Sequence, residues 1–136
     1  MPTPSTFDWA VIRVVPRVER GEQVNVGAIL YCRSQGFLEA RIALDPARLL
    51  ALAPGLDLEA VDAALALIPL VAAGDARGGP IAALPQAERF HWLTSPRSTV
   101  TQTSAIHTGL CEAPAASLDA IITRMVLPLA VGAGGT

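Results

Sequence analysis

The chain has 136 residues, the size of one domain, and its 51% hydrophobic and 16% charged residues exclude an intrinsically disordered protein. The net charge of -2 argues against a nucleic-acid-binding protein, because such proteins carry a basic surplus. All ten basic residues are arginines, which excludes chemistry that needs a lysine amine, such as a Schiff base or a P-loop.

The N-terminal residues and the cysteines indicate a cytoplasmic protein. Residues 1–6 lack the basic and then apolar pattern of a signal peptide. The longest apolar run, residues 63–73, is shorter than the about 20 residues that a membrane span needs. Cys32 and Cys111 are too few for the disulfide framework of a small secreted domain. We therefore expect no membrane segment and two reduced thiols.

Three strands are expected first along the chain. Residues 7–15 are rich in Val, Ile and aromatic residues and stop at a proline. Residues 24–32 form a second strand, in which Gly27 indicates a bulge or a close approach by another group. Residues 37–44 alternate most cleanly between apolar and polar positions. The short connections predict an antiparallel meander. In the second strand, five side chains are expected on one face: Val24, Val26, Ala28, Leu30 and Cys32.

Two helices are expected next. Asp45 suits the N-cap of a short helix that ends near Leu52, since a proline follows it at the first helical position. Asp57 caps a longer helix over residues 58–73, whose apolar residues recur at spacings of three and four. Pro69 is expected to kink the last turn of that helix.

The last third of the chain adds a short helix over 85–93, a polar β-type segment over 97–104 and a helix from Ser117 to Pro128. The element order predicts an α+β fold, an antiparallel sheet of three to four strands with helices packed on one face. We expect one domain over residues 7–130. The flanking tails are expected to be flexible: 1–6 and 131–136.

Residues 88–111 stand out because they hold both histidines, two arginines, a tryptophan and eight hydroxyl residues in a mostly aliphatic chain. One interpretation is a solvated edge strand, because threonine suits a pleated surface and polar edges prevent aggregation. The other is a surface that binds an anion or a planar polar ligand. The two interpretations are compatible.

His91 and His107 are the candidates for acid–base catalysis near neutral pH, although a lone histidine more often has a structural role. Neither is followed two residues later by Ser or Thr, as a two-histidine phosphoesterase would require. His107 and Cys111 have metal-ligand spacing, but a structural zinc site needs a second such pair. We predict no metal site and no cofactor.

The first hairpin carries charged residues of both signs. A local network of salt bridges is expected, with an anion site as the alternative. The polar amide of Asn25, near Gly27 inside a strand, needs hydrogen-bond partners, from the turn backbone or from a ligand. The residues concerned are Arg13, Arg17, Glu19, Arg20, Glu22 and Asn25.

Several segments resemble an uncharacterised bacterial family, domain of unknown function 3037. They are FDWAVIRVVP (7–16), ERGEQVNVGAIL (19–30), RFHW (89–92), PRSTV (96–100), QTS (102–104) and HTG (107–109). The resemblance spans nearly the whole chain. The family has no established activity to carry over. Its members are often encoded beside HipA-like kinases, which implies a small accessory subunit of such a kinase.

Two functions remain open. The first, favoured because no complete catalytic set is present, is a non-catalytic accessory or interaction domain of the bacterial cytoplasm, with a HipA-like kinase as its partner. The second is a small-molecule or nucleotide-phosphate binding protein, with hydrolysis as a further option, in which arginines bind phosphate and a histidine moves the proton. Its expected site is Arg13, Asn25, Arg89, His91, Arg97, Ser98, Gln102, Thr103 and His107.

Overall fold

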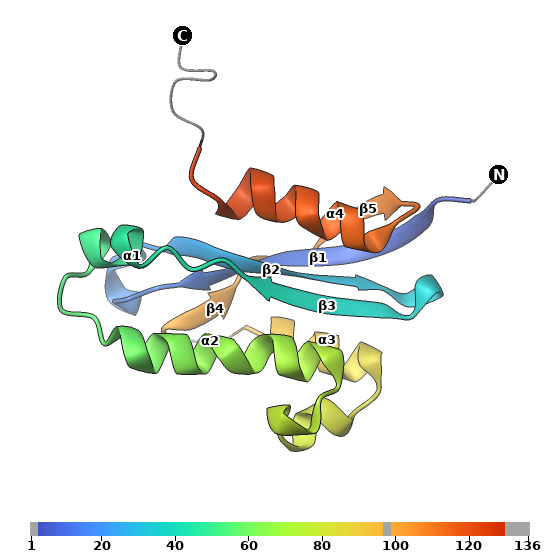
Figure 1. Ribbon diagram of the computed structural model, residues 1–136, viewed down its shortest axis with the longest axis horizontal. Helices are drawn as coiled ribbons and strands as arrows, with labels where there is room; N and C mark the ends of the chain where they lie inside the picture. Colours follow the sequence, from blue (N-terminus) through green and yellow to red (C-terminus); the bar gives the residue numbers. More distant parts are fainter. Residues whose placement is uncertain (1–2, 97–98, 130–136) are drawn as a thin grey trace, which may run out of the picture.

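A five-stranded antiparallel sheet forms the centre of the molecule, with helices on both of its faces (Figure 1). The computed structural model describes residues 3–96 and 99–129. The expected C-terminal tail, 131–136, lies outside the described residues. The α+β class predicted from the sequence is confirmed, but the sheet has more strands than the three to four expected.

The sheet has the order β3-β2-β1-β4, with β5 also paired to β1. Because β1 is long, its C-terminal half pairs with β4 and its N-terminal half with β5, along the same edge. The first strand starts two residues earlier than expected, since Ser5 and Thr6 pair with β5. The strands are β1 (Ser5–Val14), β2 (Val24–Cys32), β3 (Phe37–Ile42), β4 (Thr101–Thr103) and β5 (His107–Cys111).

The predicted meander of β1, β2 and β3 is present. Its two connections are short 3-10 turns, Val18–Arg20 and Arg33–Gln35. Each turn ends at a glycine in the left-handed region, Gly21 at φ 71° and Gly36 at φ 60°. Glycine adopts this conformation without a steric penalty, so these residues let the chain reverse into the next strand.

The second strand contains a β-bulge, which overturns the expectation that five of its side chains share one face. Ile12 pairs with Gly27 but Arg13 pairs with Asn25, so Val26 is the extra residue. The bulge shifts the alternation, because one residue inserted into a strand exchanges the faces beyond it. Val24 and Val26 therefore lie in one core, whereas Ala28, Leu30 and Cys32 lie in the other.

Gly27 also satisfies the second expectation made for it, a close approach. A Cβ atom at this position would collide with the main-chain oxygen of Arg41 on β3. The lack of a side chain at Gly27 thus lets β2 and β3 pair at the bulge.

Helices α1 and α2 begin where the sequence predicts. Asp45 accepts hydrogen bonds from the first-turn amides of α1 (Pro46–Leu52), and Asp57 accepts one from Ala60 in α2. Helix α2 (Leu58–Ala73) continues through Pro69 to its last residue. Two 3-10 turns, Ala76–Gly78 and Pro80–Ala83, connect it to α3 (Gln86–Thr94).

The last helix starts earlier than expected. Helix α4 (Pro114–Ile121) is preceded by Ala113, so the assignment of Ser117 as its N-cap is wrong. Proline suits the first helical turn, where its missing N–H would have no partner in any case. A π-helix, Ile122–Val126, continues α4.

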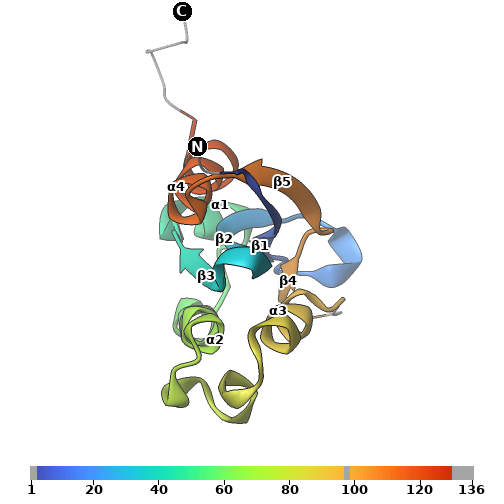
Figure 2. The same ribbon diagram turned by 90° about the vertical axis from the view of Figure 1, so that its right-hand side faces the viewer.

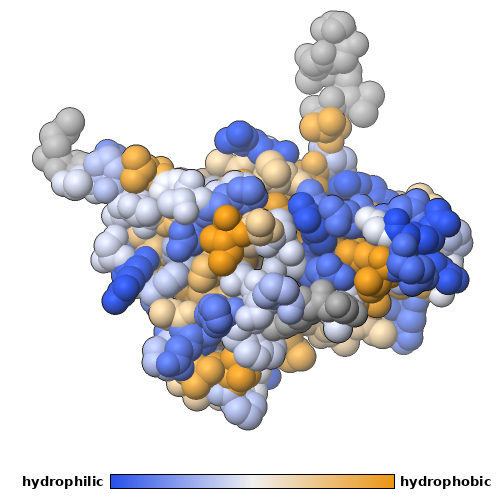
Figure 3. Space-filling view, turned by 180° about the vertical axis from the view of Figure 1, so that it is seen from behind, coloured by the Kyte–Doolittle hydropathy of each residue, from blue (hydrophilic) through white to orange (hydrophobic). Residues whose placement is uncertain are grey.

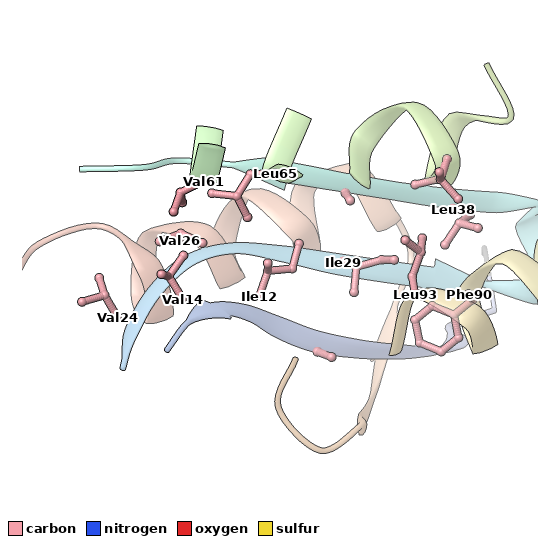
Figure 4. Packing of buried hydrophobic residues seen from close by; sticks show 14 of the residues in the cluster. Ile12, Val14, Val24, Val26, Ile29, Leu38, Val61, Leu65, Phe90 and Leu93 are labelled. Atoms are coloured by element: carbon pink, nitrogen blue, oxygen red, sulfur yellow. The ribbon is translucent and has the colours of Figure 1, made fainter. Parts of the chain in front are cut away.

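Two apolar cores lie on opposite faces of the sheet. Helices α2 and α3 cover the larger core, in which Leu65 and Phe90 pack against residues such as Ile12 and Ile29 (Figure 4). Helix α4 covers the smaller core, through Leu118 and Ile121.

The expectation of helices on one face is therefore wrong. Strands β1 and β2 carry apolar residues on both faces, and each face needs a cover. No helix in the described part of the chain combines the length and apolar character that crossing a membrane requires.

Candidate functional site

The structure distributes the nine expected site residues over several places. Arg97 and Ser98 lie outside the described residues. Three others lie side by side on neighbouring strands. Two more line a groove that also includes one of these three, and the last two contact other parts of the protein. The seven described residues are Arg13, Asn25, Arg89, His91, Gln102, Thr103 and His107.

Arg13, Asn25 and Gln102 form the row, because Arg13 on β1 pairs with Asn25 on β2 and with Gln102 on β4. The Nε of Arg13 donates to Oδ1 of Asn25 at 3.4 Å. The Nδ2 of Asn25 donates to the main-chain oxygen of Met125 at 2.9 Å. The amide that needed partners thus finds them within the chain, and it ties the π-helix to the sheet.

Arg89 connects secondary-structure elements. Its guanidinium donates to the main-chain oxygens of Leu84 and of Ala72, in the last turn of α2. A cation is favourable at a helix C-terminus, where the peptide dipoles leave negative charge. The Nε of Arg89 is buried and has no hydrogen-bond partner in the described structure. The contacts of Arg89 therefore stabilise the turns between α2 and α3.

The two histidines have different surroundings. His107 on β5 is exposed, and its ring lies over Trp9 with 4.6 Å between the ring centroids. His91 on α3 is exposed and lines a groove of about 460 Å³ at the junction of α3 and β4. Gln102 and Thr103 line the same groove. This groove brings together three of the expected site residues.

Hydroxyl groups around this groove bind the main chain. Thr94 and Ser95 donate back to the carbonyls of Phe90 and His91, at 2.8 and 2.7 Å. Ser104 is buried, and its Oγ accepts the Val11 amide at 2.9 Å. Because these contacts complete the end of α3 and the edge of the sheet, the hydroxyl-rich stretch has a structural role. The edge-strand interpretation holds for the part of the stretch that forms β4 and β5, whereas residues 88–94 belong to α3.

The first hairpin contains the ion pairs expected from its mixed charges. Arg17 lies 3.8 Å from Glu19, and Arg20 bonds Glu22. The hydrogen bond from Arg20 lowers the pKa of Glu22. These residues line a groove of about 690 Å³ between this turn and the α1–α2 connection. The arginine and glutamate side chains that line this groove already form ion pairs with each other.

The two cysteines are buried in the core beneath α4. Burial raises the pKa of the Cys111 thiol, because a charged thiolate is disfavoured in an apolar environment. His107, four residues away, is exposed and stacked on Trp9. Among the described residues, no group of three His, Cys, Asp or Glu side chains is placed to hold a metal ion.

A third groove, between α2, α3 and β4, was not expected from the sequence. It has a volume of about 460 Å³. Leu67, Trp92 and Val100 line it and remain 49%, 41% and 37% exposed. We call these lining residues the α2–α3 groove. The sequence of α2 indicates an exposed apolar surface, because it is apolar around nearly the whole circumference of the helix instead of along one stripe.

Comparison with known proteins identifies one family. The model of a protein family of unknown function, DUF3037, matches residues 9–126. No curated protein and no solved structure gives a significant match to the chain. The matched region runs from Trp9, within β1, to the end of the π-helix, so it includes the second half of β1, the other four strands and the four α-helices. The chain therefore belongs to the DUF3037 family.

Proposed function

We propose that the protein is a non-catalytic accessory domain of the bacterial cytoplasm, which binds a partner protein through the α2–α3 groove. The observation that carries this proposal is the exposure of Leu67, Trp92 and Val100 around one hollow. Large apolar side chains are scattered singly on most protein surfaces, whereas their grouping around a groove is typical of interaction sites.

The surroundings of several expected site residues support a binding role over catalysis. Arg89 is occupied by main-chain oxygens, and Arg13 bonds an asparagine that holds the π-helix. His107 stacks on Trp9. A general acid or base must reach a substrate proton, and these contacts favour structural roles. The family resemblance implies the partner, a HipA-like kinase.

Co-expression with a HipA-like kinase from the same genome tests the proposal. We expect the two proteins to co-elute on gel filtration at micromolar concentration. Leu67→Glu should weaken the complex at least tenfold, because it places a charge in an apolar interface. Ala63→Glu is the matched control, since Ala63 is exposed on α2 but does not line the groove. Separate elution of the wild-type domain and the kinase would exclude this partner.

A small-molecule site is the second candidate, because His91, Gln102 and Thr103 share one groove. A thermal-shift screen with nucleotides and phosphorylated metabolites tests it. A ligand at one hundred times its Kd should stabilise the protein by about 2.7 kcal/mol. His91→Ala should remove the shift. If none of the compounds raises the Tm, this candidate fails.

A further inference from the structure

Among the described residues, strand β5 leaves main-chain groups without hydrogen-bond partners at the outer margin of the sheet. The direction of each group follows from Val11 on β1, whose N–H and C=O both bond Ser104 at this edge. Alternate residues of a strand direct these groups to the same side, so Phe7 and Trp9 also face the edge. They pair with Gly109 and His107 of β5.

The intervening residues of β5, Thr108 and Leu110, consequently direct their N–H and C=O groups away from the sheet. In the structure of residues 3–96 and 99–129, no recorded hydrogen bond reaches these four groups. Figure 2 shows β5 at the margin of the sheet, on the side opposite β3. A strand added beside β5 would therefore meet two donors and two acceptors.

The side chains along this edge do not prevent such pairing. Leu110 is 71% exposed and Ile106, just before the strand, is 49% exposed. Residues His107–Cys111 include no Asp, Glu, Lys, Arg or Pro, the residues with which proteins usually block open edges. Seen from behind, hydrophobic side chains interrupt the hydrophilic surface of the molecule (Figure 3).

The edge is short and ends at a groove. Between the pairs Ile12–Thr103 and Trp9–His107, β1 has two residues and the opposite chain has three, so one extra residue separates β4 from β5. Ala105 and Ile106 lie in this break and line the groove that also contains His91. A strand on β5 that continues past Ile106 would place a side chain in that groove.

We infer that β5 binds an extended, apolar-containing segment of a partner protein as a further strand of the sheet. Strand addition supplies affinity through main-chain hydrogen bonds and specificity through pockets for alternate side chains. Here Thr108 and Leu110 supply the hydrogen bonds, and the groove next to Ile106 supplies the pocket. The inference rests on the proposed function only in that the domain binds proteins, because this surface is separate from the α2–α3 groove.

The occupant is a segment of another protein and not a second copy. A stable dimer buries about 1,200–2,000 Å² of surface, far more than two five-residue strands bury against each other. An extended peptide that also fills a pocket can bind specifically over a smaller area.

Selection from a library of displayed random peptides tests the inference on the full chain. The wild-type domain should enrich peptides with apolar residues at every second position. Thr108→Pro removes the outward N–H, so it should weaken their binding at least tenfold. The fold should tolerate this change, because proline occurs on edge strands where its nitrogen faces solvent. Thr108→Ala is the matched control. It keeps the N–H, loses only the hydroxyl that bonds Asp8, and should bind the peptides normally.

Leu110→Lys provides a second variant, in case the proline disturbs the fold. It leaves the main chain intact, adds the charge that natural edges carry, and should also weaken peptide binding tenfold. The inference is overturned if no peptide is enriched, or if the selected peptides bind Thr108→Pro and Leu110→Lys as they bind the wild type. A wild-type dimer on gel filtration that Thr108→Pro dissociates would also overturn it, because β5 would then pair with a second copy.

The kinase experiment separates this inference from the proposed function. A complex that Leu67→Glu weakens and Thr108→Pro leaves intact would support the α2–α3 groove alone, and would overturn β5 as a site for that partner. Failure of the kinase to bind the wild type would remove the proposed partner. The peptide selection would still decide the role of β5.

Discussion

The two edges of the sheet are built in opposite ways. At the β3 edge, Leu38 and Ala40 are 7% and 4% exposed, since they pack in the core that α2 covers. At the other edge, Leu110 of β5 is 71% exposed. We call the β3 edge closed because its apolar side chains pack in a core, and the β5 edge open because Leu110 faces solvent. At both edges the outward main-chain groups lack hydrogen-bond partners among the described residues.

The two edge strands also differ in the number of charged side chains that they carry. Strand β3 carries Glu39 and Arg41, and Arg41 bonds both Glu39 and Asp119 of α4. The corresponding positions of β5 are uncharged. An open sheet edge is a hazard that proteins usually block, so an edge left open beside a blocked one indicates that pairing there is useful.

The largest expected effect is where the interior strand β2 pairs with the closed edge strand β3, from Gly27→Ala on β2. The new Cβ would collide with the main-chain oxygen of Arg41, which cannot rotate away as a side chain can. We expect a loss of about 3 kcal/mol in the free energy of unfolding, at the upper end of overpacking effects. Urea denaturation measures it.

Gly55→Ala is the control for this substitution, because no heavy atom lies within 4 Å of a Cβ built at Gly55. It should change stability by less than about 0.5 kcal/mol. Equal effects of the two substitutions would show that the close pairing of β2 and β3 at the bulge does not constrain the fold.

A smaller effect is expected at the open edge, from Ser104→Ala. The buried amide of Val11 loses its acceptor, the Ser104 Oγ, and water cannot easily replace it. An unsatisfied buried donor costs about 1–3 kcal/mol, and we expect about 2 kcal/mol here. Thermal unfolding, compared with that of the exposed variant Thr108→Ala, provides the measurement. An unchanged Tm would mean that the break between β4 and β5 does not depend on this side chain.

The sequence predicts the long, periodic elements well. The bounds of β2 and α2 agree with their predicted ranges because the first is apolar except for Asn25 and the second is capped by Asp57. It does not predict β5, since His107–Cys111 is short and contains a glycine and three polar or exposed positions. Gly27 indicates a bulge in this strand, but the sequence does not show that Val26 is the extra residue, because that depends on the pairing of β2 with β1.

The site is harder to predict than the fold. The polar stretch 88–111 includes both strands of this sheet edge and residues that line the groove next to His91. The roles of individual residues stay hidden, because their partners are main-chain atoms distant in sequence. Arg89 binds the carbonyl of Ala72, and Ser104 binds the amide of Val11, 93 residues away. Side-chain identity does not reveal such partners.

A still smaller loss is expected from Gly109→Ala on β5. A Cβ there would lie 2.7 Å from Cζ of the Phe7 ring, the end of a side chain that can adjust. We expect a cost of about 1 kcal/mol, at the lower end of overpacking effects. In a Phe7→Leu background the cost of Gly109→Ala should decrease, which a double-mutant cycle by urea denaturation measures. A cost equal to that of Gly27→Ala would contradict the contrast between the two edges.

The smallest effect concerns the charges at β3, and it decides what closes that edge. Asp119→Asn removes the partner of Arg41 on α4, but the Asp119 side chain is 69% exposed. Exposed ion pairs contribute about 0–1 kcal/mol, so we expect a loss of at most about 0.5 kcal/mol that salt reduces further. Urea denaturation at low and high salt, with Glu112→Gln as the control at the opposite edge, measures it. A small loss means that packing against α2 closes β3. A loss well above 1 kcal/mol would instead assign that closure to the ion pairs, and the absence of charge on β5 would then be the decisive difference between the two edges.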